Sequence, residues 1–150
     1  MTIFTGTGSD ETAFGGNDSD TLFGAGGADL LIGQADVDFL YGGDGSDTLV
    51  GYLGSDTLYG DDGADTADYF HSTAGVTVRL DQGSANDGLG SVDRIFGVEN
   101  ASGSNFADTL VGDGGANQLA GMDGNDRLQG GDGNDVRLGQ AGTDTLYGDG

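Results

Sequence analysis

Cysteine and lysine are absent from this chain of 150 residues, and His71 is its single histidine. Without cysteine, the chain has no disulfide, no thiolate metal site and no thiol nucleophile. Four arginines face 26 acidic residues, which leaves a formal net charge of −22. A chain this acidic repels the phosphates of nucleic acids and the surface of anionic membranes, so neither is expected as a partner.

Long apolar runs are missing as well. No stretch approaches the roughly 18 apolar residues of a membrane-spanning helix, so no membrane span is expected. The N-terminal segment MTIFTGTGSDE has neither the basic region nor the apolar run of a Sec-type signal peptide. Leu, Ile, Val and Phe are scarce for so highly charged a chain, and composition alone leaves disorder as an open alternative.

A nine-residue period decides against disorder. From Gly15 the sequence reads GGNDSDTLF, GAGGADLLI, GQADVDFLY, GGDGSDTLV, GYLGSDTLY and GDDGADTAD; from Gly103 it reads GSNFADTLV, GDGGANQLA, GMDGNDRLQ, GGDGNDVRL and GQAGTDTLY, then GDG. Position 1 is glycine, position 6 is aspartate or once asparagine, and position 8 is usually leucine. A linker has no reason to keep this register, whereas a solenoid requires it.

The period predicts an all-β, right-handed parallel β-roll. Positions 1–6 form a glycine-rich turn, because glycine adopts positive φ without penalty. Positions 7–9 form a very short strand whose central side chain points inward. Two nonapeptides make one coil of a two-sheet solenoid, with the position-8 leucines stacked inside. We expect a single domain over 1–150, with a degenerate first repeat (1–14), a first array (15–68), a strand-containing insert (69–102) and a second array (103–150) truncated at its end.

Position 6 predicts bound metal. In stacked coils, one edge of the roll carries Asp20, Asp38 and Asp56, and the other carries Asp29, Asp47 and Asp65. Carboxylates about 4.8 Å apart repel each other by several kcal/mol at an effective dielectric constant of about 20, so a cation is expected between neighbours. Only oxygen ligands are on offer, and Ca²⁺ accepts irregular oxygen cages that Mg²⁺ does not. The expected ligands are position-6 side chains eighteen residues apart and carbonyls of the glycine turns.

GGDGSDTLV (42–50) and GGDGNDVRL (130–138) closely resemble the GGxGxDxUx nonapeptide of the RTX (repeats-in-toxin) proteins, a calcium-binding parallel β-helix motif. The resemblance implies a β-roll that is unfolded without several Ca²⁺ ions, is exported by bacterial type I secretion and folds outside the cell. The metal ligands that it implies are Asp20, Asp29, Asp38, Asp47, Asp56, Asp65, Asp108, Asn117, Asp126, Asp135 and Asp144, with the turn residues Gly42, Gly43, Gly45, Gly130, Gly131 and Gly133. Asn117 is uncharged, so its site is expected to be weaker.

Some repeats depart from the pattern. Position 4 is Asp18, Asp36 or Phe106 in three of them, so these turns are expected to differ, and Asp36 either adds a ligand or is solvated. Arg137 occupies the inward position 8, where an unpaired arginine is not tolerated. Either its strand slips by one residue or this edge of the roll is open to water.

The insert is not expected to be a linker. GVTVRLDQG (75–83) alternates apolar and polar residues as a half-buried strand does. GLGSVDRIF (88–96) is a faint nonapeptide with Asp93 at position 6 and Ile95 at position 8. We expect one continuous solenoid rather than two independent rolls.

Position 9 predicts two outward rows, formed by Phe23, Tyr41 and Tyr59 on one sheet and by Phe14, Ile32 and Val50 on the other. Exposed apolar rows are typical of binding surfaces. The alternatives are that the insert folds back across one row or that the aromatic rings stack to stabilise their sheet. Self-association through this aromatic row or through open solenoid ends follows from the first reading.

Catalysis is not expected. Neither glutamate ends an EF-hand loop, His71 has no GxSxG motif beside it, and the repeat already accounts for the paired aspartates. The predicted function is a calcium-dependent structural or folding module of a secreted, extracellular protein. The alternatives are a non-catalytic accessory domain of a secreted RTX enzyme (protease, lipase or alginate epimerase) with its catalytic domain in a longer parent chain, and a self-assembling extracellular matrix or filament unit.

Overall fold

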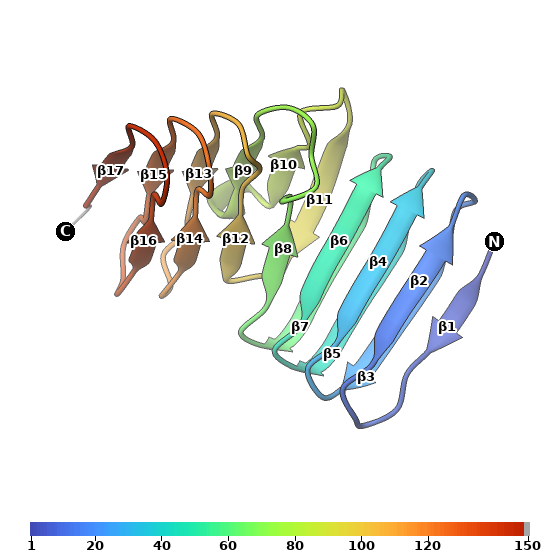
Figure 1. Ribbon diagram of the computed structural model, residues 1–150. Helices are drawn as coiled ribbons and strands as arrows, with labels where there is room; N and C mark the ends of the chain where they lie inside the picture. The colour runs from blue at the N-terminus through green and yellow to red at the C-terminus, as the bar shows by residue number, and fades with distance from the viewer. Residues whose placement is uncertain (149–150) are drawn as a thin grey trace.

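The computed structural model describes residues 1–148 and forms a parallel β-roll of about eight turns. The strands lie in two sheets that face each other along the roll (Figure 1). The ten-stranded sheet has the order β1 (Ile3–Thr5), β3 (Thr21–Gly26), β5 (Phe39–Gly45), β7 (Thr57–Gly63), β11 (Val92–Phe96), β10 (Ser84–Asn86), β9 (Thr77–Arg79), β13 (Thr109–Val111), β15 (Arg127–Gln129), β17 (Thr145–Tyr147). The seven-stranded sheet has the order β16 (Val136–Leu138), β14 (Gln118–Ala120), β12 (Asn100–Ser102), β8 (Thr66–Asp68), β6 (Thr48–Leu53), β4 (Leu30–Ala35), β2 (Thr12–Gly16).

The core is a column of position-8 side chains between the two sheets. Leu22 pairs with Leu40 and Leu40 with Leu58 in parallel register, so equivalent residues stand eighteen positions apart. The column continues in the second array with Leu110, Leu119 and Leu128, which are fully buried, and ends at Leu146, which is 48% exposed. The predicted β-roll and its inward leucines are therefore confirmed. The truncated repeat at 148–150 lies largely outside the described residues.

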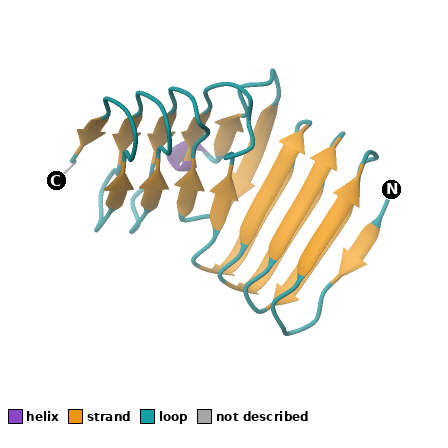
Figure 2. Cartoon of the chain, viewed as in Figure 1, coloured by secondary structure: helices purple, strands orange, loops and turns teal. Residues whose placement is uncertain are grey.

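Strands in the first array are longer than the three residues predicted. β5 and β7 each run through seven residues, because the glycine-rich turns stay in ladder register with their neighbours. Ala25 pairs with Gly43, and Gly43 pairs with Asp61. In the second array the strands do have three residues each. Within residues 1–148 the single helical element is the 3₁₀ turn Leu80–Gln82 (Figure 2), and no helix has the length and apolarity to cross a bilayer.

The insert adds strands to both sheets, but unequally. β11 pairs parallel with β7, β10 is antiparallel to both of its neighbours, and β9 pairs parallel with β13. On the opposite side only β12 lies between β8 and β14. Both sheets thus run unbroken through the insert. The strands of the second array are tilted relative to those of the first (Figure 1).

The expected strand in the insert is shorter than its pattern suggested. Val76, Val78 and Leu80 are all buried, as the alternation predicts. Only Thr77–Arg79 is extended, however, because the chain then turns through the 3₁₀ element and leaves it at Gly83 with φ of 61°. Glycine is suited to this left-handed conformation, and the reversal starts the antiparallel strand β10.

The aromatic row on the ten-stranded sheet forms as predicted and is longer than predicted. The ring centroids of Phe23 and Tyr41 are 4.8 Å apart, and those of Tyr41 and Tyr59 are 4.7 Å apart. Phe96 from the insert extends the stack, at 5.0 Å from Tyr59. The rings therefore stabilise the sheet by stacking on each other across the junction with the insert.

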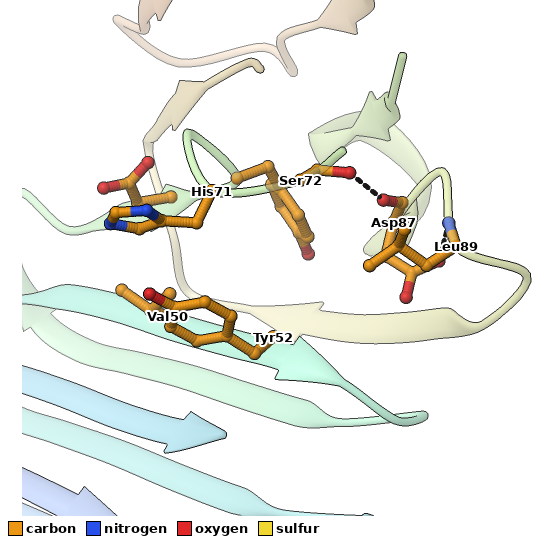
Figure 3. Close-up of a pocket in the computed structure, with 8 residues that line it drawn as sticks. Val50, Tyr52, His71, Ser72, Asp87 and Leu89 are labelled. Atoms are coloured by element: carbon orange, nitrogen blue, oxygen red, sulfur yellow. Dashed lines mark hydrogen bonds between the residues drawn. The ribbon is translucent and has the colours of Figure 1, made fainter. Parts of the chain in front are cut away.

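The second row is partly covered by the insert. Phe14, Ile32 and Val50 are aligned in register on the seven-stranded sheet. Phe14 is 57% exposed, whereas Val50 is only 5% exposed. Val50 and Tyr52 line a small cavity, and His71 from the insert lines its other side (Figure 3). The insert therefore folds back over one end of this row, as one of the alternatives predicted.

Candidate metal centre

Two files of acidic side chains run along the edges of the roll. We call file 1 the side chains at or directly before the start of strands of the ten-stranded sheet, and file 2 those directly before strands of the seven-stranded sheet; all are position-6 residues except Glu99. File 1 contains Asp20, Asp38, Asp56, Asp93, Asp108, Asp126 and Asp144, with an interruption at the insert. File 2 contains Glu11, Asp29, Asp47, Asp65, Glu99, Asn117 and Asp135. All eleven side chains expected to bind metal therefore lie in these two files.

One oxygen of each first-array carboxylate is bound to the backbone of the preceding coil. Asp38 Oδ1 accepts the N–H of Asp20 at 2.7 Å, and Asp56 Oδ1 accepts the N–H of Asp38 at 2.9 Å. Asp47 and Asp65 accept from residues eighteen positions earlier in the same way, each at 2.8 Å. These bonds satisfy buried backbone donors that neither sheet uses, which periodicity alone did not indicate.

The other oxygen of these carboxylates is buried and has no partner. This holds for Oδ2 of Asp20, Asp29, Asp38, Asp47, Asp56 and Asp65, which are six consecutive position-6 residues of the first array. Each of these residues is at most 3% exposed. A buried carboxylate oxygen without a hydrogen bond is costly, so each repeat of the first array presents an acceptor suited to a positively charged or proton-donating group.

Each orphaned oxygen lies beside the position-1 glycine of its own repeat. A Cβ built on Gly15 would lie 2.8 Å from Asp20 Oδ2 and 2.5 Å from the carbonyl oxygen of Gly33 in the next coil. Gly24 and Gly42 have the same surroundings, a carboxylate oxygen of their own repeat and a carbonyl oxygen of the next coil. The absence of a side chain at position 1 therefore leaves a cradle lined by oxygen atoms, which are the ligands that Ca²⁺ prefers.

Burial makes these carboxylates hard to ionise unless a cation is present. Desolvation, with a smaller contribution from neighbouring carboxylates, raises the pKa of Asp38 and Asp65 to about 6 and that of Asp56 to about 7. The backbone N–H bonds lower the pKa but do not outweigh burial. Desolvation also raises the pKa of Asp47. A bound cation would favour the ionised form and remove this penalty.

The files do not form compact clusters of side chains. Among residues 1–148, no three His, Asp or Glu side chains converge closely enough to hold a metal by themselves. A cation in either file would therefore be held by carboxylates of successive coils together with turn carbonyls. Such irregular oxygen cages suit Ca²⁺ better than Mg²⁺.

Comparison with known families agrees with this donor set. A family model of the RTX calcium-binding nonapeptide repeat (4 copies) matches residues 5–40, 32–67 and 102–136, which together cover about two-thirds of the chain. The chain belongs to the RTX repeat family. Its cofactor is accordingly Ca²⁺. No curated protein matches the chain at a significant level.

The RTX matches stop at residue 67 and resume at residue 102, so they leave the insert out. The structure nevertheless continues both files into it. Asp93 Oδ1 accepts the N–H of Asp56 and Glu99 Oε2 accepts the N–H of Asp65, both at 2.9 Å. Asp93 has a signal in the sequence, position 6 of the faint nonapeptide. Glu99 has none, because it follows Asp65 by 34 residues.

Three RTX-file side chains beyond the first array have protein partners on the second oxygen. Tyr69 donates its hydroxyl to Asp93 Oδ2 at 2.9 Å. The N–H of Ser104 donates to Asp108 Oδ2 at 2.6 Å, and its hydroxyl donates to Oδ1 at 2.8 Å. Arg137 Nη1 lies 3.3 Å from Asp135 Oδ2.

Asn117 also has a full set of partners. Its side-chain oxygen accepts the N–H of Asp113 at 2.9 Å, and its Nδ2 donates to the carbonyl oxygen of Glu99 at 2.7 Å. Nδ2 is also 3.2 Å from Asp113 Oδ1. An amide can make this second set of bonds because it carries donors that a carboxylate lacks.

Arg137 keeps its place in the strand. β16 is in register with β14, and Arg137 pairs with Leu119 at the inward position. The alternative of a slipped strand is therefore wrong. The side chain is 22% exposed, so it reaches water while its guanidinium pairs with a carboxylate that is 1% exposed.

The atypical position-4 residues are solvated. Asp36 is exposed and adopts φ of 70° in place of glycine, and Asp18 is exposed and accepts a bond from the N-terminal amine at 3.0 Å. Phe106 is 46% exposed. Of the turn glycines expected to offer carbonyls, Gly43 and Gly45 have φ of 103° and 145°, and the equivalent residues Gly131 and Gly133 have φ of 93° and 114°.

A further buried carboxylate lies outside the repeats. Asp87 is 1% exposed; its Oδ1 accepts the N–H groups of Leu89 and Ser91, and its Oδ2 has no partner. It lines the cavity between the insert and the seven-stranded sheet, and its backbone carbonyl accepts the Ser72 hydroxyl at 2.6 Å (Figure 3). The cavity volume of about 20 Å³ admits a water molecule but no organic substrate.

Proposed function

We propose that this RTX roll binds several Ca²⁺ ions along the two files and that binding drives its folding. The six orphaned Oδ2 atoms of the first array carry this proposal. Each is buried and belongs to an ionisable group, and those of Asp20, Asp29, Asp47 and Asp65 lie beside a position-1 glycine that also faces a carbonyl oxygen of the next coil. Ca²⁺ would supply the positive charge that lets these groups be buried in ionised form.

The ligand set follows the repeat. In the first array it consists of Asp20, Asp29, Asp38, Asp47, Asp56 and Asp65, with carbonyls of turns such as Gly42, Gly43 and Gly45. The second-array counterparts are Asp108, Asn117, Asp126, Asp135 and Asp144, with Gly130, Gly131 and Gly133. The chain itself orients each carboxylate, because Oδ1 is tied to the backbone of the preceding coil and only Oδ2 remains for the metal.

Metal binding and folding are coupled in such a site. The ligands come from coils eighteen residues apart, so the site exists only when the roll is wound. Binding free energy then becomes folding free energy. With a net charge of −22, the metal-free chain also repels itself, which favours the expanded state.

The biological role we propose is a non-catalytic structural and folding module of a secreted bacterial protein. It stays unfolded where Ca²⁺ is scarce, leaves the cell by type I secretion and folds outside. Family membership supports this role. An accessory domain beside a secreted catalytic domain is the alternative on the same grounds. Self-assembly is a second alternative, favoured by Phe14 and Phe96, which are 57% and 46% exposed on the two outward rows.

The test is a Ca²⁺ titration that reads secondary structure and mass together. Far-ultraviolet circular dichroism is expected to show less strand in chelator than in millimolar Ca²⁺, with Mg²⁺ as the matched control ion. Light scattering on the same samples separates a monomeric module from a self-assembling unit. Full strand signal in chelator would contradict calcium-driven folding.

A further inference from the structure

In the first array, Oδ2 of the position-6 carboxylates has no partner in the protein. In the insert and the second array, several of these oxygens do have one. Six consecutive file residues from Asp20 to Asp65 have an orphaned Oδ2, whereas Asp126 is the one described file residue after Asp65 that has one. At four other file positions this oxygen is bound by the Tyr69 phenol, the Ser104 amide N–H or the Arg137 guanidinium, or is replaced by the side-chain amide of Asn117. Except at Asn117, the difference lies in neighbouring residues and not in the position-6 side chains.

Tyr69 supplies a proton donor at the junction. The side chain is 94% buried by the insert and its hydroxyl donates to Asp93 Oδ2 at 2.9 Å. Burial and the charge of Asp93 raise the pKa of Tyr69 well above its usual value, so the hydroxyl keeps its proton. File 1 of the first array therefore ends at a carboxylate whose second oxygen is already satisfied.

Ser104 supplies two donors through a different turn. Position 2 has positive φ in first-array repeats, for example 85° at Gln34 and 71° at Tyr52, but Ser104 does not. Its N–H instead points to Asp108 Oδ2 at 2.6 Å, and Ser104 is fully buried. Asp113 makes the equivalent bond to Asn117. The turn conformation thus provides the hydrogen bond that the first array lacks.

Arg137 supplies a fixed positive charge. Its Nη1 lies 3.3 Å from Asp135 Oδ2, beside Gly130. In the first array the corresponding glycine, Gly42, has a carboxylate and a carbonyl oxygen around it and no protein cation. Guanidinium stays charged at any physiological pH, so it neutralises the carboxylate permanently. Arg137 takes the place of a core leucine, because leucine packs at position 8 in most other repeats.

We propose that Tyr69, Ser104 and Arg137 take the place of Ca²⁺ in the insert and second array, so that the chain binds its calcium in the first array and keeps residues 69–147 wound without it. Asp126 and Asp144 are the remaining calcium-competent carboxylates of the second array, because Tyr69, Ser104 and Arg137 bind Asp93, Asp108 and Asp135 instead. The inference rests on the proposed function, because it assumes that the first array binds Ca²⁺. It departs from a uniform file of calcium sites, which the eleven repeated position-6 residues predicted.

Hydrogen exchange of the full chain, read by mass spectrometry in chelator and in Ca²⁺, tests the division directly. In chelator, amides of β13–β16 are expected to exchange at least about tenfold more slowly than those of β3–β7, and Ca²⁺ is expected to slow the first array alone. Fast exchange of both arrays in chelator, with both slowed by Ca²⁺, would overturn the inference and leave the proposed function standing. Slow exchange of both arrays in chelator would overturn both.

Two substitutions test the replacing groups themselves. Arg137→Leu restores the usual position-8 residue and frees Asp135 Oδ2, so native mass spectrometry is expected to count one more Ca²⁺ ion. Tyr69→Phe removes only the hydroxyl and frees Asp93 Oδ2, with the same expected gain. Arg79→Leu, on an exposed pair with Asp81, and Tyr59→Phe, in the ring stack, are the matched controls. An unchanged ion count in folded Arg137→Leu and Tyr69→Phe would overturn the assignment.

Discussion

The first and second arrays share one nonapeptide period, but two repeats of the second array build a different turn from it. Strands β3 to β7 contain six or seven residues each, whereas β13 to β17 contain three. In the first array, position 2 has positive φ and its amide leaves the position-6 carboxylate alone. At Ser104 and Asp113 the same amide binds the position-6 side chain.

This contrast shows that a conserved spacing within the chain does not determine how each buried carboxylate is neutralised. Arg137, two residues after Asp135, and Tyr69, 24 residues before Asp93, each provide a donor that the first-array carboxylates lack. The following substitutions and conditions are chosen to widen or remove the contrast between the arrays.

The largest expected effect is that of pH in the absence of metal. The pKa of Asp56 is about 7 in the folded chain and that of Asp38 and Asp65 is about 6, against about 3.9 when unfolded. The folded form binds these protons more tightly, so their contribution to stability is full below pH of about 4 and is lost as pH rises through about 6 to 7. In chelator, circular dichroism is expected to show more strand at pH of about 5 than at pH of about 8. Equal signals at both values would contradict the buried, metal-free carboxylates.

Gly45→Ala is expected to destabilise the calcium-loaded roll by about 3 kcal/mol. Its Cβ would collide with the carbonyl oxygen of Gly27 in the preceding coil, and its φ of 145° disfavours a side chain. Gly114→Ala in the second array is the control, because no atom lies within 4 Å of the added methyl group. Thermal unfolding in Ca²⁺ should separate the two variants; similar melting temperatures would disprove close packing of the first-array turns.

Asp47→Asn is expected to raise the Ca²⁺ concentration at the folding midpoint by about tenfold. The amide oxygen can still accept the N–H of Asp29, so the change removes charge from file 2 and little else. Asp135→Asn is the second-array counterpart and is expected to leave the midpoint unchanged, since Arg137 already neutralises that carboxylate. A shift of the same size in both variants would mean that the two arrays are equivalent.

The smallest effects are expected on the outward faces. Tyr41→Leu breaks the middle of the aromatic stack and should cost about 1 kcal/mol in urea unfolding with Ca²⁺ present. Arg127→Gln removes the cation that lies 4.1 Å above the Tyr147 ring and should cost about 0.5 kcal/mol. A neutral Tyr41→Leu would show that the stack does not stabilise the sheet.

The sequence was sufficient for the features that repeat with the period. Buried leucines, the two files and the stacked rings all follow from a spacing of eighteen residues. It was not sufficient for the backbone N–H bonds to Oδ1, the long first-array strands or the bonds of Tyr69 and Ser104, because these depend on turn dihedrals and on contacts across the insert. Glu99 could not be predicted from the period, because it follows Asp65, its neighbour in file 2, by 34 residues and not by eighteen.

The bonds of the position-6 side chains point one way along the chain. Within an array, the backbone N–H of a position-6 residue donates to the side chain eighteen residues later, as Asp20 does to Asp38 and Asp29 to Asp47. This buried donor of each coil therefore stays unsatisfied until the following coil has wound. Within an array, every later coil completes the one that precedes it in the chain.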